Sequence, residues 1–249
     1  RYSFVGCNPR AVIKQTGNRV EVIETGKVVE SFLIEAKPLT LSLSPSDGER
    51  VAKPGEGNSV RDGLEVVERV LAHYRPVALP GLPRFTGGAV GFIGYEFIHD
   101  VEPVVPRPPT DELRTPTMCF LIADELLIFD RVAQTITILV NAILDDATDP
   151  AAAYENAISE IERIIALLEQ PTEHHPITLP REVPAVPFES NMPKAKFLAN
   201  VSQAREYITA GDIIQVVGSQ RFSTPVKASP LDIYRAARSI NPSPYMFLL

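Results

Sequence analysis

Three short runs near the start of the chain combine β-branched apolar residues with polar ones, at residues 11–16, 19–24 and 27–34. The dipeptides "GN" and "TG" separate these runs, and Gly and Asn are common in tight turns because they tolerate left-handed backbone conformations. Runs of this length joined by such turns predict three antiparallel strands in sequence.

A helix is predicted after the Ser-, Pro- and Gly-rich loop of residues 42–58. Ser59 is the expected N-cap, with Asp62 three residues later, where an acidic side chain favours the start of a helix. Apolar side chains then recur at helical spacing. They are Leu64, Val67, Leu71 and Tyr74.

Three further apolar runs, 84–97, 117–130 and 135–144, predict strands. Asp149 and Pro150 then supply an N-cap and a first helical turn. The helix that they open is expected to pack against a sheet through one apolar stripe. Its members are Tyr154, Ile158, Ile161, Ile165 and Leu168.

A third helix is predicted to end at Gly211, a residue type suited to the left-handed backbone after a helix. Its apolar face consists of Phe197, Val201, Ala204 and Ile208. A strand at 212–222, a short helix at 230–240 and a final apolar strand within 241–249 are expected after it.

Five prolines between residues 171 and 187, without hydrophobic periodicity, indicate a linker. The predicted organisation is a domain at 1–170, a linker at 171–190 and a second domain starting at 191–249. A strand meander with segregated helices predicts an α+β fold with antiparallel sheets.

Composition narrows the classes of protein. The chain has 249 residues, 45% of them hydrophobic, and a net charge of −7, with no Lys/Arg-rich run that would bind nucleic acid. Cys7 and Cys119 are too few for a disulfide framework or a metal cluster, and buried thiols are expected. His174 and His175 lie in the linker, where solvent exposure is expected. No stretch has the length or apolarity of a membrane span, and the expected location is the cytoplasm.

The glycines of "TGGAVGFIGYEF" do not match a nucleotide-binding loop, because neither G-x-G-x-x-G nor a phosphate-binding Lys-Ser/Thr is present. Glycines within an aromatic strand more often allow close approach of a neighbouring backbone. The close-packing interpretation is preferred.

Period-two spacing divides the predicted strand 212–222 into two faces. One face carries Gln215, Val217, Ser219 and Arg221, and the other is mostly apolar, with Ile214, Val216, Gly218 and Phe222. The polar face suits either the floor of a cleft or a solvent-facing surface, and the pattern leaves both open.

The segment "NPSPYM" combines two prolines with an aromatic residue and a methionine. Pro242 and Pro244 hold Asn241 and Ser243 extended and lack N–H donors, so nearby carbonyls stay available as acceptors. Such a segment suits a ligand with an ammonium group and an apolar ring. A strand entered through a kinked turn is the structural alternative.

Four motifs, "RYSFVGCNP", "LPRFTGGAVGFIGYEF", "AGDIIQVVGSQRF" and "SINPSPYMF", occur in the order and spacing of the large subunit of anthranilate synthase. The whole chain resembles the N-terminal half of that subunit family, and it is expected to begin and end inside a longer protein. The resemblance implies layered antiparallel sheets with outer helices, incomplete here because the catalytic half follows. It implies a lyase that uses chorismate and ammonia.

The resemblance also implies site residues. "NPSPYM" corresponds to the tryptophan-binding segment, so Pro244, Tyr245 and Met246 are expected to bind L-tryptophan, in a pocket shaped by Asn241 and Ser243. "RYS" corresponds to the other wall of that pocket. Its residues are Arg1, Tyr2 and Ser3, and the acidic residue and Ser that precede them in the family are absent.

Gln215 separates the related enzymes, because isochorismate synthases carry a water-activating Lys at the matching position and a Gln cannot act as that base. Gln215 is therefore a candidate for the active-site floor of an ammonia-adding enzyme. Gly218 departs from the family, which usually has a large apolar residue there. Aminodeoxychorismate synthase component I also has the Gln, but its counterpart of "NPSPYMF" usually differs.

The resemblance places the Mg²⁺ ligands and the catalytic His beyond Leu249, so this chain alone is expected to be inactive and to hold no metal. The implied partners are a glutamine amidotransferase subunit, chorismate as substrate and L-tryptophan as inhibitor. A free-standing tryptophan-sensing module remains an alternative, which the length of the reading frame would distinguish.

Overall fold

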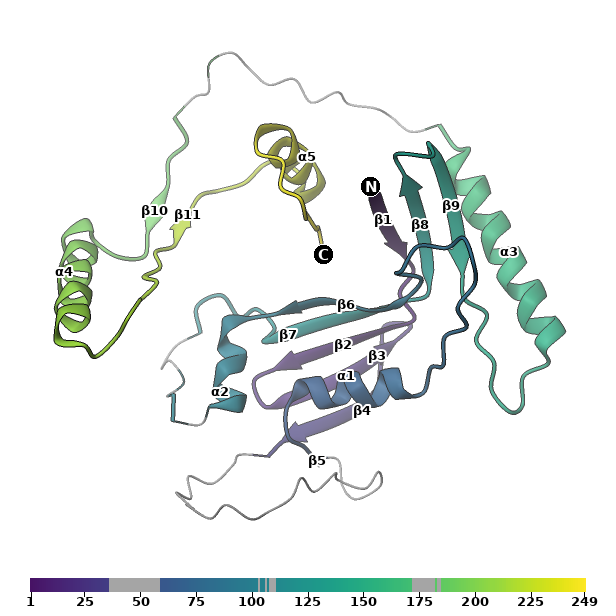
Figure 1. The fold of residues 1–249 in the computed structure, drawn as a ribbon, viewed down its shortest axis with the longest axis horizontal. Coiled ribbons are helices and arrows are strands. Elements are labelled where there is room, and N and C mark those ends of the chain that lie inside the picture. Colours follow the sequence, from purple (N-terminus) through teal and green to yellow (C-terminus); the bar gives the residue numbers. More distant parts are fainter. Residues whose placement is uncertain (36–58, 103, 106, 108–110, 172–181, 183–184) are drawn as a thin grey trace. The chain divides into compact units, whose positions relative to one another are not determined.

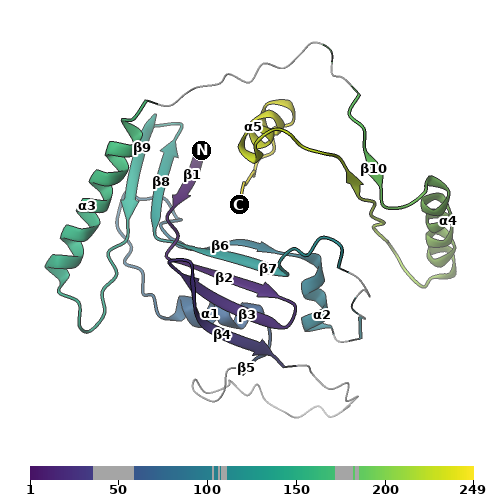
Figure 2. The same cartoon turned by 180° about the vertical axis from the view of Figure 1, so that it is seen from behind.

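The computed structural model describes residues 1–249 except 36–58, 103, 106, 108–110, 172–181 and 183–184. Two compact units make up the chain, Arg1–Pro171 and Thr172–Leu249. Each unit is described by itself below. The elements are labelled in Figure 1 and seen from behind in Figure 2.

The larger sheet of the first unit has six strands in the order β5-β4-β3-β2-β7-β6. The predicted meander is present as β2 (Ala11–Thr16), β3 (Arg19–Glu24) and β4 (Lys27–Ile34), paired antiparallel in sequence. The sheet is completed by β5 (Ser59–Val60), β6 (Gly88–Ile93) and β7 (Met118–Ala123). Only β5 runs parallel to its neighbour, among the strands described.

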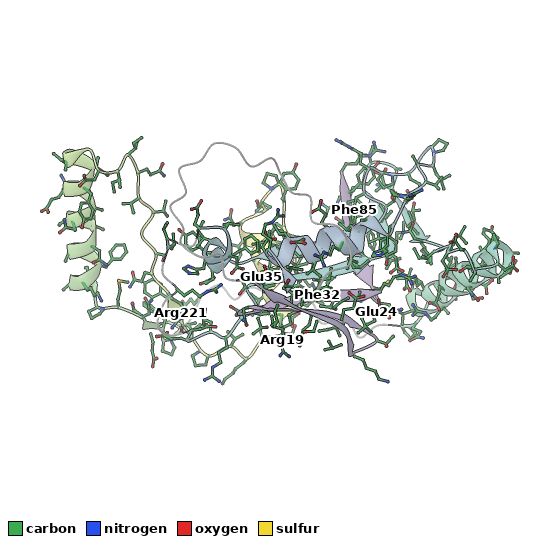
Figure 3. The ribbon with its side chains drawn as sticks, turned by 90° about the horizontal axis from the view of Figure 1, so that it is seen from below. Arg19, Glu24, Phe32, Glu35, Phe85 and Arg221 are labelled. Carbon is green, nitrogen blue, oxygen red and sulfur yellow. The ribbon has the colours of Figure 1, made fainter. Side chains whose placement is uncertain are left out.

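Helix α1 (Gly63–Ala72) lies along one side of this sheet, as Figure 3 shows. Its side chains and those of the sheet share one core, in which Ile13, Val20, Val66 and Met118 have no exposed surface. The predicted stripe is confirmed, because all four of its residues contact this core. They are Leu64, Val67, Leu71 and Tyr74.

The start of α1 differs from the sequence prediction. Asp62 is the N-cap, and its Oδ1 accepts a hydrogen bond of 3.1 Å from the Glu65 amide. Ser59 instead lies in β5, where it pairs with Leu33 of β4. The prediction of Ser59 was wrong because the strand pairing extends through Val60, and Asp62 is the first residue after it able to cap.

A second sheet has the antiparallel order β1-β8-β9, formed by β1 (Tyr2–Cys7), β8 (Glu125–Asp130) and β9 (Thr135–Val140). The run 117–130, expected as strand, therefore contributes β7 and β8 to different sheets, with only Asp124 between them. The run 84–97 gives β6 and a short 3₁₀ turn η1 (Tyr95–Phe97), which precedes α2 (Ile98–Val101).

Helix α3 (Pro150–Leu168) packs against β9. Asp149 is its N-cap, as predicted, and the Asp149 side chain accepts a hydrogen bond of 3.2 Å from the Ala151 amide. The buried face of α3 is rotated from the predicted stripe. Ala153 and Ile164 are buried and Ile158 and Ile161 of the predicted stripe are half-buried, whereas Tyr154, Ile165 and Leu168 are exposed. One residue turns a helix by 100°, so the buried Ala153 and Ile164 each lie one position around the helix from the exposed Tyr154 and Ile165.

The described residues of the second unit form two helices and one short strand pair. Helix α4 (Lys194–Ala210) ends at Gly211, whose φ of 84° is the predicted left-handed cap, and α5 (Pro230–Ile240) matches the predicted short helix. The strand pair joins β10 (Glu189–Ser190) to β11 (Phe222–Ser223).

Two strand predictions in this unit are wrong. Of the predicted strand 212–222 only Phe222 is in a strand, and residues 241–249 form none. An extended segment becomes a strand only when a neighbour accepts and donates its backbone hydrogen bonds. Among the described residues, the only strand that pairs with this region is the two-residue β10.

The described fold is α+β, as predicted. No helix among the described residues is both long and apolar enough to cross a membrane.

Candidate functional site

The first predicted wall of the ligand pocket begins with Arg1, which is paired to the partner strand. Its guanidinium Nη2 lies 2.7 Å from Oδ2 of Asp130, and Nε lies 3.1 Å from the same oxygen. The other carboxylate oxygen accepts from the amides of Val132 and Ala133. The pKa of the Asp130 carboxyl is lowered to about 2, mainly by the hydrogen bond from Arg1 and to a smaller extent by those from the two amides. Arg1 thus serves the β1–β8 pairing.

Tyr2 and Ser3 lie on opposite faces of β1, because successive residues of a strand alternate. The Tyr2 ring lies 6.0 Å from that of Phe4, which meets Phe85 edge-on at 5.5 Å (Phe85 is labelled in Figure 3). Ser3 Oγ accepts a hydrogen bond of 3.1 Å from Arg131. A ligand on the Tyr2 face would therefore meet aromatic edges.

The end of the "RYSFVGCNP" motif and Arg10, which follows it, pair with two acidic residues at the junction of the sheets. Arg10 pairs with Asp124 at 2.8 Å, and Asn8 Nδ2 donates to Glu125 Oε1 at 3.1 Å. Glu125, buried, also accepts from Arg163 of α3 at 3.2 Å. The sequence analysis did not single out Asp124 and Glu125. Two adjacent acids inside an apolar run were the signal that could have identified them.

The second predicted wall follows α5 directly. The Asn241 amide donates to the Ala237 carbonyl at 2.9 Å and ends the helix. Asn241, Ser243, Pro244 and Tyr245 are exposed, with 87% of Tyr245 accessible, while Met246 is half-buried. Their side chains make no hydrogen bond to another described residue. Polar groups of this segment are thus open to a ligand.

An apolar hollow of about 560 Å³ has Leu248, two residues after this segment, in its lining. It is lined by α5 and the residues before it. The lining residues are Val226, Ala228, Pro230, Ile233, Tyr234 and Leu248. Its chemistry suits an apolar ring, and the sequence analysis did not predict it.

Gln215, the candidate for an active-site floor, is exposed and lies outside any strand. Ile214 and Val217 beside it are 97% and 82% exposed. The polar and apolar faces expected of a strand are not formed here, and the role of Gln215 stays a prediction.

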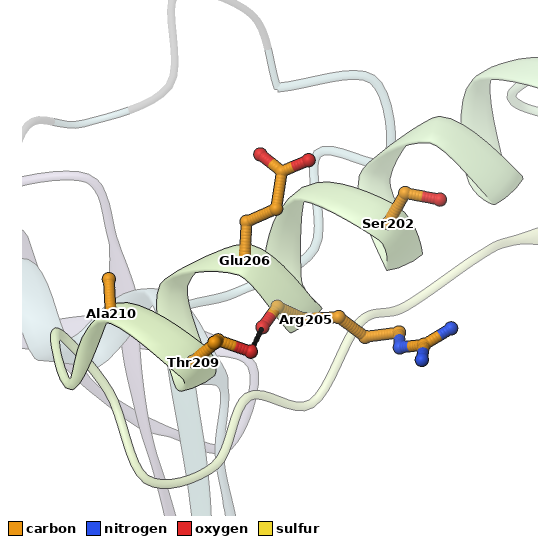
Figure 4. A pocket seen from close by; sticks show the side chains of 5 residues that line it. All are labelled: Ser202, Arg205, Glu206, Thr209 and Ala210. Atoms are coloured by element: carbon orange, nitrogen blue, oxygen red, sulfur yellow. Dashed lines mark hydrogen bonds between the residues drawn. The ribbon is translucent and has the colours of Figure 1, made fainter.

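A second surface hollow, of about 550 Å³, lies along α4 and is shown in Figure 4. Ser202, Arg205, Glu206, Thr209 and Ala210 line it. Thr209 Oγ1 donates to the carbonyl of Arg205 at 2.9 Å, a bond within the helix. A single helix face without a buried polar group does not define a site.

No three His, Cys, Asp or Glu side chains gather as a metal site within the described residues. Cys7 and Cys119 are half-buried free thiols, and burial raises the pKa of both. His174 and His175 lie outside the described residues.

The predicted site residues belong to two units. Arg1–Ser3 lie in the first unit, whereas Gln215 and the segment 241–246 lie in the second. Within the second unit, the segment 241–246 is continuous, and Leu248, two residues after it, lines the apolar hollow. The pocket with two walls stays a prediction.

Comparisons with known proteins give a consistent result. The family model described as chorismate binding enzyme matches residues 43–249. An anthranilate synthase component 1 from Acetivibrio thermocellus is 32% identical, covering 100% of this chain and 45% of that protein. The one from Synechocystis sp. is 34% identical over 99% of this chain and 44% of that protein. The one from Saccharomyces cerevisiae is 34% identical over 88% of this chain and 45% of that protein.

The crystal structure of anthranilate synthase component I from Streptococcus pneumoniae TIGR4 is similar in fold, with a TM-score of 0.66 and 26% sequence identity. The match covers 99% of this chain and 47% of that chain. This chain therefore spans about half the length of the relatives that it matches.

Proposed function

Because the chain belongs to the family of chorismate-binding enzymes, we propose that it is the N-terminal part of an anthranilate synthase component I. The observation that carries the proposal is the match to proteins of that name across 99% or 100% of this chain. The similarity of fold to the Streptococcus pneumoniae component I, at a TM-score of 0.66, supports it.

The proposed reaction of the whole subunit converts chorismate and ammonia to anthranilate, pyruvate and water, in the cytoplasm, for tryptophan biosynthesis. A glutamine amidotransferase subunit would supply the ammonia from glutamine. Gln215 is consistent with addition of ammonia, because an amide cannot deprotonate water as a Lys can.

The described residues do not fit a Mg²⁺ site, because no three candidate ligands gather among them. The resemblance to component I is the reason why the proposal assigns the Mg²⁺ ligands and the general acid and base to residues outside this sequence. The 249-residue chain alone is expected to form no anthranilate.

The segment 241–246 is proposed to bind L-tryptophan as a feedback inhibitor. The exposure of its carboxamide, hydroxyl and Tyr245 supports this, as does the apolar hollow of about 560 Å³ that Leu248 lines two residues further on. A buried ammonium group needs hydrogen-bond acceptors, and the transfer of an indole ring from water to an apolar surface lowers the free energy. The polar segment and the apolar hollow together offer both.

The test uses the reading frame that contains this sequence, supplied with chorismate, Mg²⁺ and ammonium, with and without L-tryptophan. We expect anthranilate, at a rate that falls as tryptophan rises. Tyr245→Ala should raise the tryptophan concentration for half-inhibition about tenfold or more, equivalent to about 1.4 kcal/mol. The control Tyr154→Ala, at a tyrosine of α3 in the first unit that is 62% exposed, should leave it within about twofold.

Three other outcomes would each contradict part of the proposal. Aminodeoxychorismate or isochorismate would assign the protein to a related enzyme. Anthranilate that is indifferent to tryptophan would remove the inhibitor site and keep the enzyme. Anthranilate made by the 249-residue chain alone would show that its catalytic groups lie within this sequence.

A further inference from the structure

Two clusters of buried hydrophobic side chains are present in the described residues of the first unit. One packs the larger sheet against α1 and includes Ile13 and Met118, and the other lies in the smaller sheet around Leu126 and Ile128. Ala123, the last residue of β7, is the member that the larger sheet contributes to the second cluster. Apolar packing therefore does little to fix the angle between the sheets, and contacts at their junction must fix it.

The two sheets meet at a bend in one pair of strands, which Figures 1 and 2 show. β1 continues into β2 and pairs with β8, while β7 continues into β8 and pairs with β2. Between the last pairing of the smaller sheet and the first pairing of the larger one, three residues (8–10) face two (123 and 124). A mismatch of this kind bends a strand pair. Asn8 has a left-handed φ of 48° at the bend. Residues 8–10 and 123–124 are called the joint below.

One ion pair closes the joint. Nε and Nη2 of Arg10 each lie 2.8 Å from Oδ2 of Asp124, whose side chain is 13% exposed. Oδ1 of Asp124 is buried and accepts no hydrogen bond from a described residue. A carboxylate removed from water needs a compensating charge, and Arg10 supplies it. Loss of Arg10 would leave a charged, unpaired Asp124 at the bend.

The two partners of this ion pair are anchored to different sheets. The backbone N–H of Arg10 donates to the Ile122 carbonyl of β7, in the larger sheet, at 3.0 Å. The Asp124 carbonyl accepts from the backbone N–H of Asn141, directly after β9 of the smaller sheet, at 3.0 Å. It also accepts from the Asn141 side chain at 3.1 Å. The Arg10–Asp124 pair therefore spans the bend and resists a change in the angle between the sheets.

β1 converts a tilt at the joint into a displacement of the predicted ligand residues. The strand is six residues long, which corresponds to about 20 Å from the joint to its far end. A tilt of about 10° would move that end by about 3.5 Å relative to the larger sheet. Hydrogen-bond lengths vary by only about 0.5 Å, so a ligand contact there would be lost. The far end of β1 begins at Tyr2, beside Arg1, and Ser3 follows.

We propose that Arg10 and Asp124 are positioning residues for the proposed inhibitor site. Their ion pair fixes the angle between the two sheets, and β1 carries that angle to Arg1, Tyr2 and Ser3. The pair contacts neither substrate nor inhibitor and acts through the position of β1. This inference rests on the proposed function, because the tryptophan site is assigned there.

The first experiment measures inhibition by L-tryptophan in the reading frame that contains this sequence. Arg10→Ala should raise the tryptophan concentration for half-inhibition about tenfold or more, with kcat and the KM for chorismate unchanged within about twofold. Arg10→Lys should stay within about threefold of the unaltered protein, because both Arg10 nitrogens contact one oxygen, which an ammonium group can also do. Adding Asp124→Asn to Arg10→Ala should cause no further loss, since both remove one pair.

Arg69→Ala is the matched control. The Arg69 side chain is 39% exposed, against 40% for Arg10, and it pairs with Glu65 within α1 at 2.5 Å. The substitution removes an ion pair of similar exposure away from the joint. It should leave the concentration for half-inhibition within about twofold.

A second measurement needs no ligand. Residual dipolar couplings of the backbone amides in the 249-residue chain report the orientation of each sheet. In the unaltered chain, the amides of β1, β8 and β9 and those of β2, β3 and β7 should fit one alignment tensor. In Arg10→Ala, one tensor with the unaltered angle between the sheets should no longer fit both sets.

Three results would overturn the inference. They are unchanged inhibition in Arg10→Ala, a kcat that falls as much as inhibition weakens, and dipolar couplings of Arg10→Ala that still fit the unaltered angle. The second would show that the pair supports the fold as a whole. An unaltered reading frame that forms no anthranilate, or ignores tryptophan, would instead overturn the proposed function. The dipolar couplings would then still decide whether the pair fixes the angle.

Discussion

Gly91 occupies a position in the larger sheet that has no room for a side chain. It lies in β6 opposite Phe120, and a Cβ atom there would stand 1.9 Å from the carbonyl oxygen of Cys119. Its backbone is not left-handed, so space and not φ excludes a side chain. The sequence interpretation, close backbone approach instead of a nucleotide loop, is confirmed at this position.

Gly91→Ala is expected to lower the free energy of unfolding by about 1–3 kcal/mol, because the strands must separate to admit the methyl group. Gly6→Ala is the control, since nothing lies within 4 Å of the Cβ that it would add in β1. It should change the free energy by less than about 0.5 kcal/mol. Denaturant unfolding followed by circular dichroism measures both, and equal effects would contradict the explanation.

Elements of this chain form where the local signals agree with a neighbouring surface. Helix α3 begins at its predicted N-cap because Asp149 and Pro150 act locally. Its rotation on β9 depends on which side chains fit the sheet, and that differs from the predicted stripe. The predicted strand 212–222 had the right alternation but lacks a neighbouring strand among the described residues.

Asp62→Ala is expected to destabilise the first unit by about 0.5–2 kcal/mol, since the amide of Glu65 would lose its acceptor. Ser59→Ala, at the cap position predicted from the sequence, should cost less than about 0.5 kcal/mol because Ser59 contributes through its strand backbone. Thermal unfolding of the two variants distinguishes the caps. A larger loss for Ser59→Ala would reverse the assignment.

The first unit has a hydrophobic core, whereas the described residues of the second unit include no buried side chain. The core residues around Ile13 and those around Leu126 have their packing partners within the first unit. In the second unit, side chains such as Val201 and Ile208 of α4 and Ile214 are at least 44% exposed. Stability is therefore expected to reside in the first unit.

A chain that ends at Pro171 is expected to unfold with a free energy within about 0.5 kcal/mol of that of the 249-residue chain. The physical reason is that residues after Pro171 supply no buried side chain in the described structure. Urea unfolding of both chains, monitored by circular dichroism, tests this. A substantial loss of stability on truncation would show that the second unit supports the first.

The sequence by itself determined the features that depend on neighbouring residues: the β2–β4 meander, the caps at Asp149 and Gly211, and the motifs that identified the family. These follow from backbone preferences and short-range hydrogen bonds. Only the tertiary structure decided the split of 117–130 between two sheets, the buried face of α3 and the absence of a strand at 212–222. Each of these depends on a partner surface distant in the sequence, and hydrophobic alternation specifies that a face will be buried without specifying what will bury it.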